Sequence, residues 1–538
     1  MELSFDPFLN FSKLQAICEQ FAAAAPEFVR LSEIGRSREG RPLLLLTVTD
    51  FSTGDPKDKP GILIQSNIHC HELAGPLAAL HTVQRLVENR DQDGILKNTV
   101  YYVLPRINPD YAERVIEHSG WIRSRRDDRD ERPNTFHQED VDGNGLILRI
   151  RQECPDGNLC IDPDNLQRMI PRRADSKPPF YRVFPEGTIH NWDGVTPFAE
   201  CFFEGKYRDW NRNWNAFWNP QEWGAGAFPF SEPEVYCQAT FMADHPNLFA
   251  SIAYHNGLES VMVPPQGCSE NELDPGDRKL LEKAGRLASK HFGFPFYFAS
   301  RMEARSDMPL VLRGGNYLDF AYYTMGLISV LVELGTVENS SGLSTETILS
   351  QLPDKYDEAE SMRNWQKMHP DRRKAWHDWK PFLHPQLGPV EIGDVDIPVL
   401  AVPDTEHLQK ICENAYHFSV DLAKKATRME LNSPEVQEIS PGIFRIRLEV
   451  FNHGETPDHV TNQMLKLPDK PEPYLEIASL DGAECLSLSQ HRKPGHFKPW
   501  ELRREEWFFR KKSGVKNASV IFKLHGGPAG TVSRAILF

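Results

Sequence analysis

The sequence predicts a mixed α/β domain followed by an all-β sandwich. Residues 31 to 104 follow the order strand, strand, strand, helix, strand, which is typical of a mixed α/β sheet. Two further apolar runs, 249–254 and 327–332, have the length of buried strands in the same sheet. In the last hundred residues, alternating apolar and polar positions replace helical periodicity, and this pattern predicts a separate β-sandwich.

The stretch GILIQSNIHCHELAGPLAALHTVQRLVEN, residues 61–89, is the centre of the predicted domain. It begins with an apolar run, Gly61–Ile64, that predicts a buried strand. Between this strand and a following helix lies the polar turn Asn67–Glu72, at the strand end where open α/β sheets bind ligands. The helix is predicted by apolar residues at intervals of three and four: Leu73, Leu77, Leu80, Val83 and Val87.

The remaining elements follow from local patterns. Residues 31–50 predict two strands joined by a glycine-containing turn. The segment Val100–Leu104 predicts a buried strand that ends in a turn at Asn108-Pro109-Asp110. A helix is expected after Ser231, because this capping residue precedes a first-turn proline and acidic residues. Further helices are expected over residues 277–292 and 406–428.

With 538 residues, the chain predicts two to four domains. We place the first domain at residues 1–430 and the sandwich at residues 431–538. Two segments are expected to interrupt the first domain. Both are rich in charged residues and Pro and have little periodicity. They are a long insertion at about 124–206 and a second excursion at about 336–403.

The insertion contains a motif that resembles the start of a calcium loop. Asp140, Asp142 and Asn144 occupy the first ligand positions of the run DVDGNG. The twelfth position holds Arg151 instead of the bidentate Glu that such a loop needs. An Asx-rich turn is therefore the favoured interpretation, and a calcium site is the alternative.

Composition and charge argue against several classes of protein. The formal net charge of −15 is unsuited to a nucleic-acid partner, which requires a basic surface. No run of 18 apolar residues is present, so no membrane span is expected. The amino-terminal stretch lacks a basic start, and the nine cysteines form no C-x-x-C pair. We expect a cytoplasmic protein, and a secreted mature form stays open if a leader has been removed.

Polar residues follow three of the predicted strands and are expected on one rim of the sheet. They are the pair His69 and Glu72, then His255, then Glu333. Two histidines and one carboxylate, with a fourth position open, form a catalytic zinc site. A further Glu that does not bind the metal would activate water. Taken singly, a His at a helix start is more often a cap or a packed residue, and His255 and Glu333 are more often ordinary strand-end residues.

Six motifs in order then resemble the zinc carboxypeptidase family of the carboxypeptidase A type. The resemblance covers roughly residues 30 to 335 and the closing helix to about 428, and the insertion interrupts it. The motifs are SNIHCHELAG, VLPRINPDYAE, DWNRNWN, FSEPE, SIAYHNG and SVLVELGT. The resemblance implies a central mixed sheet with helices on both faces and one Zn²⁺ per chain. His69, Glu72 and His255 would hold that zinc, and Glu333 would be the general base and later the proton donor.

The resemblance also implies roles for residues that contact substrate. Arg123, fifteen residues after Asn108, would polarise the scissile carbonyl, although nearby arginines leave a solvated charged face as the alternative. Asn211 and Arg212 would grip a terminal carboxylate, which the planar guanidinium suits.

The sequence departs from the digestive members of the family at two positions and by one extra residue between Gly315 and Asp319. His71 stands where those members carry a substrate-contacting Arg, and Leu310 where they carry a mobile Tyr. Leu318 or a neighbour would line the specificity pocket, which predicts an apolar or aromatic terminal side chain.

The sequence thus predicts a zinc-dependent metallopeptidase that removes C-terminal residues from peptides. Its substrate would be a peptide or amino-acid conjugate with a free carboxylate, with no nucleic-acid or membrane partner. One alternative is a zinc amidase, a deacylase, or a hydrolase of cell-wall or side-chain-linked peptides. Another is a non-catalytic binding protein, against which the presence of Glu333 beside three ligands argues.

Overall fold

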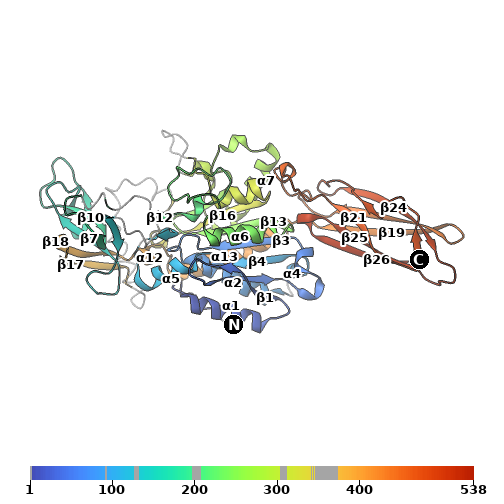
Figure 1. Cartoon of the computed structure of the whole chain (residues 1–538), viewed down its shortest axis with the longest axis horizontal. Helices are drawn as coiled ribbons and strands as arrows, with labels where there is room; N and C mark the ends of the chain where they lie inside the picture. Colours follow the sequence, from blue (N-terminus) through green and yellow to red (C-terminus); the bar gives the residue numbers. More distant parts are fainter. Residues whose placement is uncertain are drawn as a thin grey trace.

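The computed structural model describes residues 3–90, 94–120, 122–126, 133–196, 201, 207–302, 312–340, 342, 344–345 and 374–538. Three bodies lie along the long axis of the molecule: an accessory β unit, a central α/β body and a C-terminal β unit (Figure 1). Within the described residues, no helix is both long enough and apolar enough to cross a membrane.

The central body is built on an eight-stranded mixed sheet with the order β1-β2-β4-β3-β13-β16-β14-β15. The four middle strands β4, β3, β13 and β16 run parallel to one another, and β14 is parallel to β15. The pairs β1–β2, β2–β4 and β14–β16 are antiparallel. This arrangement confirms the predicted mixed α/β sheet. The strands are β1 (Val29–Arg36), β2 (Pro42–Val48), β3 (Gly61–Ser66), β4 (Val100–Leu104), β13 (Leu248–His255), β14 (Glu259–Val263), β15 (Phe296–Phe298) and β16 (Ile328–Leu334).

Helices cover both faces of this sheet and bury two separate cores. On one face, α1, α2, α7 and α13 pack over Ile62, Ile64 and Val332. On the other, α6 and the residues around Trp210 cover Leu63 and Leu331. Successive strand residues point to opposite faces, so burial on both sides explains the unbroken apolar runs of the sequence. The helices are α1 (Phe11–Ala24), α2 (Ala74–Glu88), α5 (Pro109–His118), α6 (Pro233–Ala243), α7 (Pro275–Phe292) and α13 (Thr405–Ala423).

The accessory β unit joins the insertion to the second excursion. Its six-stranded sheet has the order β17-β18-β7-β10-β8-β9, so strands from both segments pair side by side (Figure 1). The strands are β7 (Arg149–Glu153), β8 (Leu159–Asp162), β9 (Asn165–Pro171), β10 (Phe180–Pro185), β17 (Trp376–His384) and β18 (Gly388–Val395). A short ladder of β6 (Thr135–Gln138) and β11 (Gly187–His190) lies next to it in sequence. The insertion and the second excursion were predicted as separate segments, and their pairing in one sheet was not predicted.

Arg151 connects the two parts of this unit. Its guanidinium forms two hydrogen bonds with Glu391 of β18, at 2.7 and 3.0 Å, and lies over the rings of Tyr181 and Trp379. Arg151 is 6% exposed. This contact explains why an arginine stands at the position where a calcium loop would need a glutamate.

The C-terminal β unit is a two-sheet sandwich around its own apolar core, as predicted. The sheets have the orders β19-β20-β24-β22 and β23-β21-β25-β26, and Trp507, Phe509 and Phe522 lie fully buried between them. The alternating burial of β20 agrees with the alternating sequence pattern. The strands are β19 (Met429–Ser440), β20 (Ile443–Asn452), β21 (Tyr474–Asp481), β22 (Ala483–Cys485), β23 (His491–Arg492), β24 (Leu502–Lys511), β25 (Ser519–His525) and β26 (Thr531–Leu537). The exact division between domains stays a prediction.

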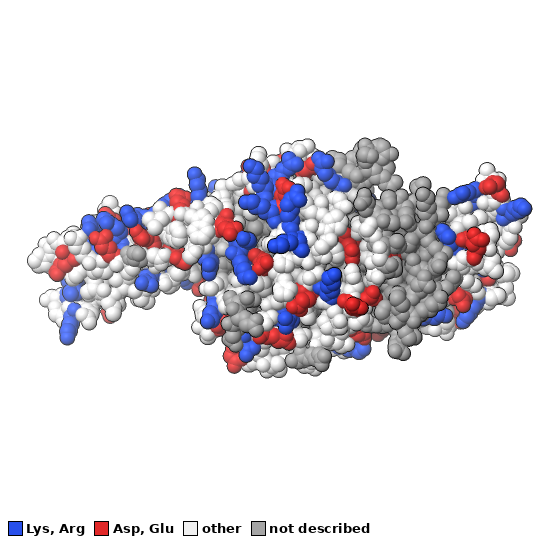
Figure 2. Space-filling view, turned by 180° about the vertical axis from the view of Figure 1, so that it is seen from behind, with Lys and Arg blue, Asp and Glu red and all other residues white. Residues whose placement is uncertain are grey.

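Charged side chains of both signs are interspersed over the surface, with a group of Lys and Arg side chains over the central body (Figure 2). Helix α7 contributes a group of basic side chains to the surface. Its exposed charged residues are all basic, while its apolar stripe faces the core. They are Arg278, Lys279, Lys283, Arg286 and Lys290.

Candidate active site

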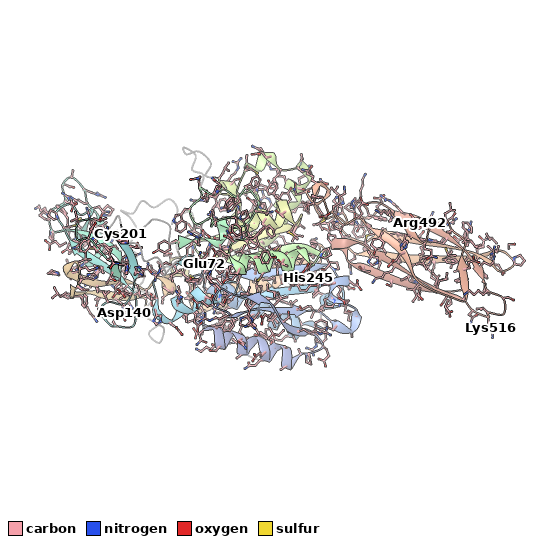
Figure 3. The ribbon with its side chains drawn as sticks, viewed as in Figure 1. Glu72, Asp140, Cys201, His245, Arg492 and Lys516 are labelled. Carbon is pink, nitrogen blue, oxygen red and sulfur yellow. The ribbon has the colours of Figure 1, made fainter. Side chains whose placement is uncertain are left out.

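Three strands of the central sheet bring polar side chains to one rim. The turn Asn67–Glu72 follows β3, and β13 ends at His255. In the parallel ladder between β13 and β16, His255 lies directly opposite Glu333. Because parallel strands share one carboxyl end, residues far apart in the sequence converge there, around Glu72 in Figure 3.

Asn67 shapes the turn that presents the first two of these residues. It adopts a left-handed backbone conformation with φ of 61°, which Asn tolerates better than most residues. Its Nδ2 donates to the carbonyl oxygens of His69 (2.8 Å) and Glu72 (3.0 Å), and its Oδ1 accepts from Arg106 Nε (2.8 Å). The Asn67 side chain thus holds the backbone of the turn, and Arg106 holds the Asn67 side chain.

His69, Glu72 and His255 form a compact, buried donor set. His69 Nδ1 lies 2.7 Å from Glu72 Oε1, His255 Nδ1 lies 3.0 Å from Glu72 Oε2, and the two Nδ1 atoms are 3.2 Å apart. All three side chains are at most 2% exposed. Although burial acts to raise it, the charges of His69 and His255 hold the pKa of Glu72 well below its usual range. Two imidazole nitrogens and a carboxylate facing one point are the ligands of a catalytic zinc, so these residues fit that ion.

Glu333 lies beside this set on the neighbouring strand. Its Oε2 is buried and, among the described residues, has no hydrogen-bond partner. Gly257 leaves room next to it, because a Cβ at that glycine would come within 3.3 Å of Oε2. Burial raises the pKa of Glu333 to about 7, with Glu72 adding to the rise and His255 and Arg123 opposing it. The carboxyl group is therefore poised to exchange a proton near neutral pH.

Asp209 also belongs to this cluster, and its place there was not predicted from the sequence. Its Oδ1 lies 3.1 Å from His69 Nε2, and its Oδ2 accepts from Arg123 Nε at 3.2 Å. Burial acts to raise its pKa, but Arg123, His69 and Arg212 hold it well below the usual range. One carboxylate thus orients both His69 and Arg123. The available signal was its place directly before the Trp210-Asn211-Arg212 motif.

Arg123 faces the donor set and does not belong to a solvated charged face. Its NH1 lies 3.9 Å from Glu72 Oε1, and its side chain is 29% exposed, so part of it stays accessible. Neighbouring Arg125 points elsewhere and forms a bidentate pair with Glu232, at 2.8 and 3.1 Å. The arginine run is therefore divided between separate partners. Its later member Arg129 lies outside the described residues.

Asn211 and Arg212 lie on the short 3₁₀ turn that follows Asp209. Asn211 Oδ1 accepts from the backbone of Tyr317 at 2.8 Å, which fixes the turn against the segment before β16. Arg212 is 7% exposed, and its Nε lies 3.6 Å from Glu222 Oε1. Burial lowers the pKa of Arg212, with Asp209 opposing and the positive charges of Arg123 and Arg313 adding to the decrease. Two guanidinium groups near one carboxylate give this edge of the site a positive potential.

The two further residues predicted to contact substrate are placed differently. His71 is buried, its Nδ1 donates to Ile122 O at 3.1 Å, and burial lowers its pKa to about 4, so it stays neutral. Leu318 is 2% exposed and packs in the core on the α6 side of the sheet with Trp214 and Phe320. Leu310 lies outside the described residues. A substrate contact by His71 or Leu318 stays a prediction.

The DVDGNG motif is remote from this site, as the labels of Asp140 and Glu72 show in Figure 3. Asp140 accepts from the backbone of Asn144 (3.0 Å) and Gly145 (2.7 Å), which is the favoured Asx-rich turn. Glu186, from the segment after β10, joins Asp140 and Asp142, and it accepts from the backbone of Val141 at 2.8 Å. Glu186 lies outside the loop in sequence, so the twelfth-position rule does not identify this carboxylate. Calcium binding stays a prediction.

Comparison with known proteins agrees with this geometry. A family model described as zinc carboxypeptidase matches residues 14–160 and 193–360, which is more than half of the chain. The chain belongs to the zinc carboxypeptidase family. A second family model, for a domain of unknown function, matches residues 428–536.

Individual members of the family are distant. The chain is 30% identical over 125 residues to carboxypeptidase B of Astacus astacus, covering 23% of this chain and 40% of that protein. It is 31% identical over 123 residues to carboxypeptidase A4 of Mus musculus, covering 21% of this chain and 29% of that protein. The alignments thus span less than half the length of these relatives.

Solved structures include similar chains at low identity. Bovine thrombin-activatable fibrinolysis inhibitor, in complex with tick carboxypeptidase inhibitor, aligns with a TM-score of 0.42 and 15% identity over 77% of this chain and 96% of that chain. Carboxypeptidase A from Helicoverpa armigera aligns with a TM-score of 0.44 and 16% identity over 79% of this chain and 76% of that chain.

Proposed function

We propose that this chain is a zinc-dependent carboxypeptidase that hydrolyses the last peptide bond of peptides with a free C-terminus. The observation that carries the proposal is the convergence of His69, Glu72 and His255 with Glu333 on the adjacent strand. A purely structural cluster would not need an unpartnered carboxylate beside it, since a buried unpaired acceptor is costly. Membership of the zinc carboxypeptidase family supports the same reaction class.

His69, Glu72 and His255 are the residues that would hold the zinc. When bound, zinc supplies Lewis acidity that polarises a carbonyl and makes water acidic near neutral pH. Asp209 keeps the His69 ring in place by holding its second nitrogen, 3.1 Å away. The protein thus provides both the ligands and the support that orients them.

Glu333 performs the proton transfers. Its Oε2 takes a proton from the attacking water and later delivers it to the leaving amine nitrogen. A pKa raised to about 7 suits both steps, because the group accepts and releases a proton at similar cost near neutral pH. Arg123, held by Asp209 and partly exposed, donates hydrogen bonds to the carbonyl oxygen as negative charge develops on it.

Arg212 and Asn211 select the free C-terminus. The Arg212 guanidinium binds a terminal carboxylate bidentately, and Asn211 adds an amide donor from the same turn. Arg123 and Asp209 lie between this turn and the donor set. A terminal carboxylate at Arg212 therefore brings the last peptide bond toward Glu333.

A second candidate is a zinc amidase or deacylase on the same scaffold. It is favoured by one observation: Arg212 already has an acidic neighbour, Glu222, at 3.6 Å. If that pair persists with substrate bound, Arg212 is not available to bind a terminal carboxylate.

The proposal is tested by incubating the purified full chain with a peptide that has a free C-terminus and identifying the products by mass spectrometry. We expect release of single C-terminal residues, loss of activity with a chelator and recovery with Zn²⁺. Cleavage only at internal or side-chain amide bonds would support the second candidate. No hydrolysis by the zinc-loaded protein of any peptide in a panel of defined C-termini would contradict the proposal.

A further inference from the structure

A loop of the C-terminal unit docks on the central body at a point remote from Glu333. The loop, residues 453–473, connects β20 to β21 and lies beside the central body in Figure 1. Thr461 Oγ1 donates to Gly326 O at 2.6 Å, in the turn that leads into β16. The side chains of Val460 and Met464 are buried in the two cores of the central body. This loop therefore helps to set how the sandwich sits on the α/β sheet.

The same loop contributes two of three side chains that meet at this junction. Asp458 and His459 lie in the loop, and His496 comes from the segment between β23 and β24. Asp458 Oδ1 lies 3.4 Å from His459 Nδ1, and Asp458 Oδ2 lies 2.9 Å from His496 Nδ1. The two imidazole rings are 5.0 Å apart between centroids. Each residue offers a ligand atom within 4.8 Å of the other two.

The charge balance of this junction cluster favours a cation. Asp458 has a side chain that is 1% exposed, and its Oδ1 accepts from the backbone of Phe497 at 2.7 Å. Within the described part of the chain, Asp458 forms ion pairs with the two histidines and with no Lys or Arg. A buried carboxylate needs a compensating positive charge. His496 Nε2 is also buried and has no hydrogen-bond partner among the described residues.

The donor set matches the ligand preference of zinc. Two imidazoles and one carboxylate are the same groups that form the catalytic cluster of this chain, where ligand atoms lie 2.7–3.2 Å apart. Zinc bonds of about 2.0–2.1 Å in a tetrahedral arrangement place neighbouring ligand atoms about 3.3–3.4 Å apart. The separations of 2.9 and 3.4 Å at Asp458 are close to that value. We propose that Asp458, His459 and His496 form a second zinc site, separate from the active site.

The position of the site indicates what zinc would do there. It would tie the docking loop to the segment before β24, two parts of the sandwich that are separated in sequence by β21–β23. The site exists only when these segments are folded together, so zinc binds the folded state preferentially and stabilises the junction. Val460, next to His459, adopts a left-handed φ of 62°, which is rare for a β-branched residue and shows that the surrounding contacts hold this loop in place. His459 and His496 are 10% and 22% exposed at their side chains, which leaves the site reachable.

The test is a count of bound zinc by native mass spectrometry, with the full chain first stripped by a chelator and then loaded with Zn²⁺. We expect two ions in the native protein, one in His69→Ala, one in His496→Gln and none in the double variant. His453→Gln is the matched control, because His453 lies in the same loop and pairs with Glu430 outside the cluster. That variant should keep two ions. A native protein whose single ion is retained in His496→Gln, or a His496→Gln variant that keeps two ions, would overturn the proposal.

A second readout guards against misfolding of the variants. Co²⁺ loaded into His69→Ala should give the visible absorption of a low-symmetry cobalt site, since the junction cluster remains intact. His69→Ala combined with His459→Gln should lose that absorption while keeping the far-ultraviolet circular dichroism of the native chain. Absence of cobalt absorption in a folded His69→Ala protein would also overturn the proposal. Neither the ion count nor the cobalt absorption depends on hydrolysis, so failure of the proposed peptidase activity would leave both results interpretable.

Discussion

His69 Nε2 lies 3.1 Å from Asp209 Oδ1, on the side of the imidazole opposite the Nδ1 atom that faces Glu72. The carboxylate therefore selects which nitrogen of His69 is free to bind a metal, and it keeps the ring from rotating. Because Asp209 also binds Arg123, at 3.2 Å, it couples His69 to the arginine of the site. Replacing this residue is informative for that reason.

The first prediction concerns Asp209→Asn, which keeps the size of the side chain and removes its charge. We expect zinc affinity to fall about 10- to 100-fold, because the partner of a ligand histidine tunes its basicity and orientation. Competition with a chromophoric chelator measures the affinity. Asp244→Asn, at an exposed residue that follows α6, is the control and should bind zinc as the native chain does. Unchanged affinity in Asp209→Asn would show that the contact with His69 is incidental.

The second prediction concerns Glu333→Gln, which retains shape but cannot accept a proton. We expect kcat to fall at least about a hundredfold, with zinc content and substrate binding close to normal. Steady-state kinetics and metal analysis measure the two quantities. Glu27→Gln, at an exposed position, is the control. If kcat stays at the native value, another group acts as the base.

The third prediction concerns Glu222, which faces Arg212 at 3.6 Å and is 22% exposed at its side chain. We expect Glu222→Gln to lower KM for peptides with a free C-terminus by up to about fivefold, because a partly exposed pair contributes less than about 1 kcal/mol. The value of kcat should not change, since the competition affects binding alone. A rise in KM would mean instead that Glu222 positions Arg212 for the substrate.

The fourth prediction concerns the accessory unit. Arg151→Ala should reduce the free energy of unfolding by about 1–3 kcal/mol, because it leaves Glu391 without its bidentate partner and removes contacts with two rings. Chemical denaturation followed by tryptophan fluorescence measures the change, since Trp379 lies in this unit. Arg182→Ala, whose partner Asp156 is 73% exposed, is the control and should change stability little. Equal effects of the two changes on the free energy of unfolding would show that Arg151 contributes no more to stability than an exposed arginine does.

Much of the central body could be predicted from local sequence. The unbroken apolar run of β3 and the spaced leucines of α2 reveal elements whose burial repeats with a simple period. The site residues His69, His255 and Glu333 follow from the rule that parallel strands end at one rim, together with the family motifs.

Contacts between distant segments could not be predicted in this way. The accessory sheet pairs Arg151 with Glu391, and no local pattern in either segment records its partner. Asp209 was missed because its role depends on the position of His69, 140 residues away. Glu186 and His496 likewise join their clusters only through folding. Strand register and long-range pairing depend on tertiary structure, so the local periodicity of the sequence does not reveal them.

The central claim is tested most directly by comparing kcat/KM for one peptide with a free C-terminus and for the same peptide with a C-terminal amide. A charge-assisted bidentate contact in a desolvated site is worth roughly 2–4 kcal/mol, so we expect the native chain to prefer the free acid by about 30- to 1,000-fold. Arg212→Ala should abolish most of this preference while retaining zinc. Equal cleavage of the two peptides by the native chain would contradict the carboxypeptidase assignment and favour the amidase.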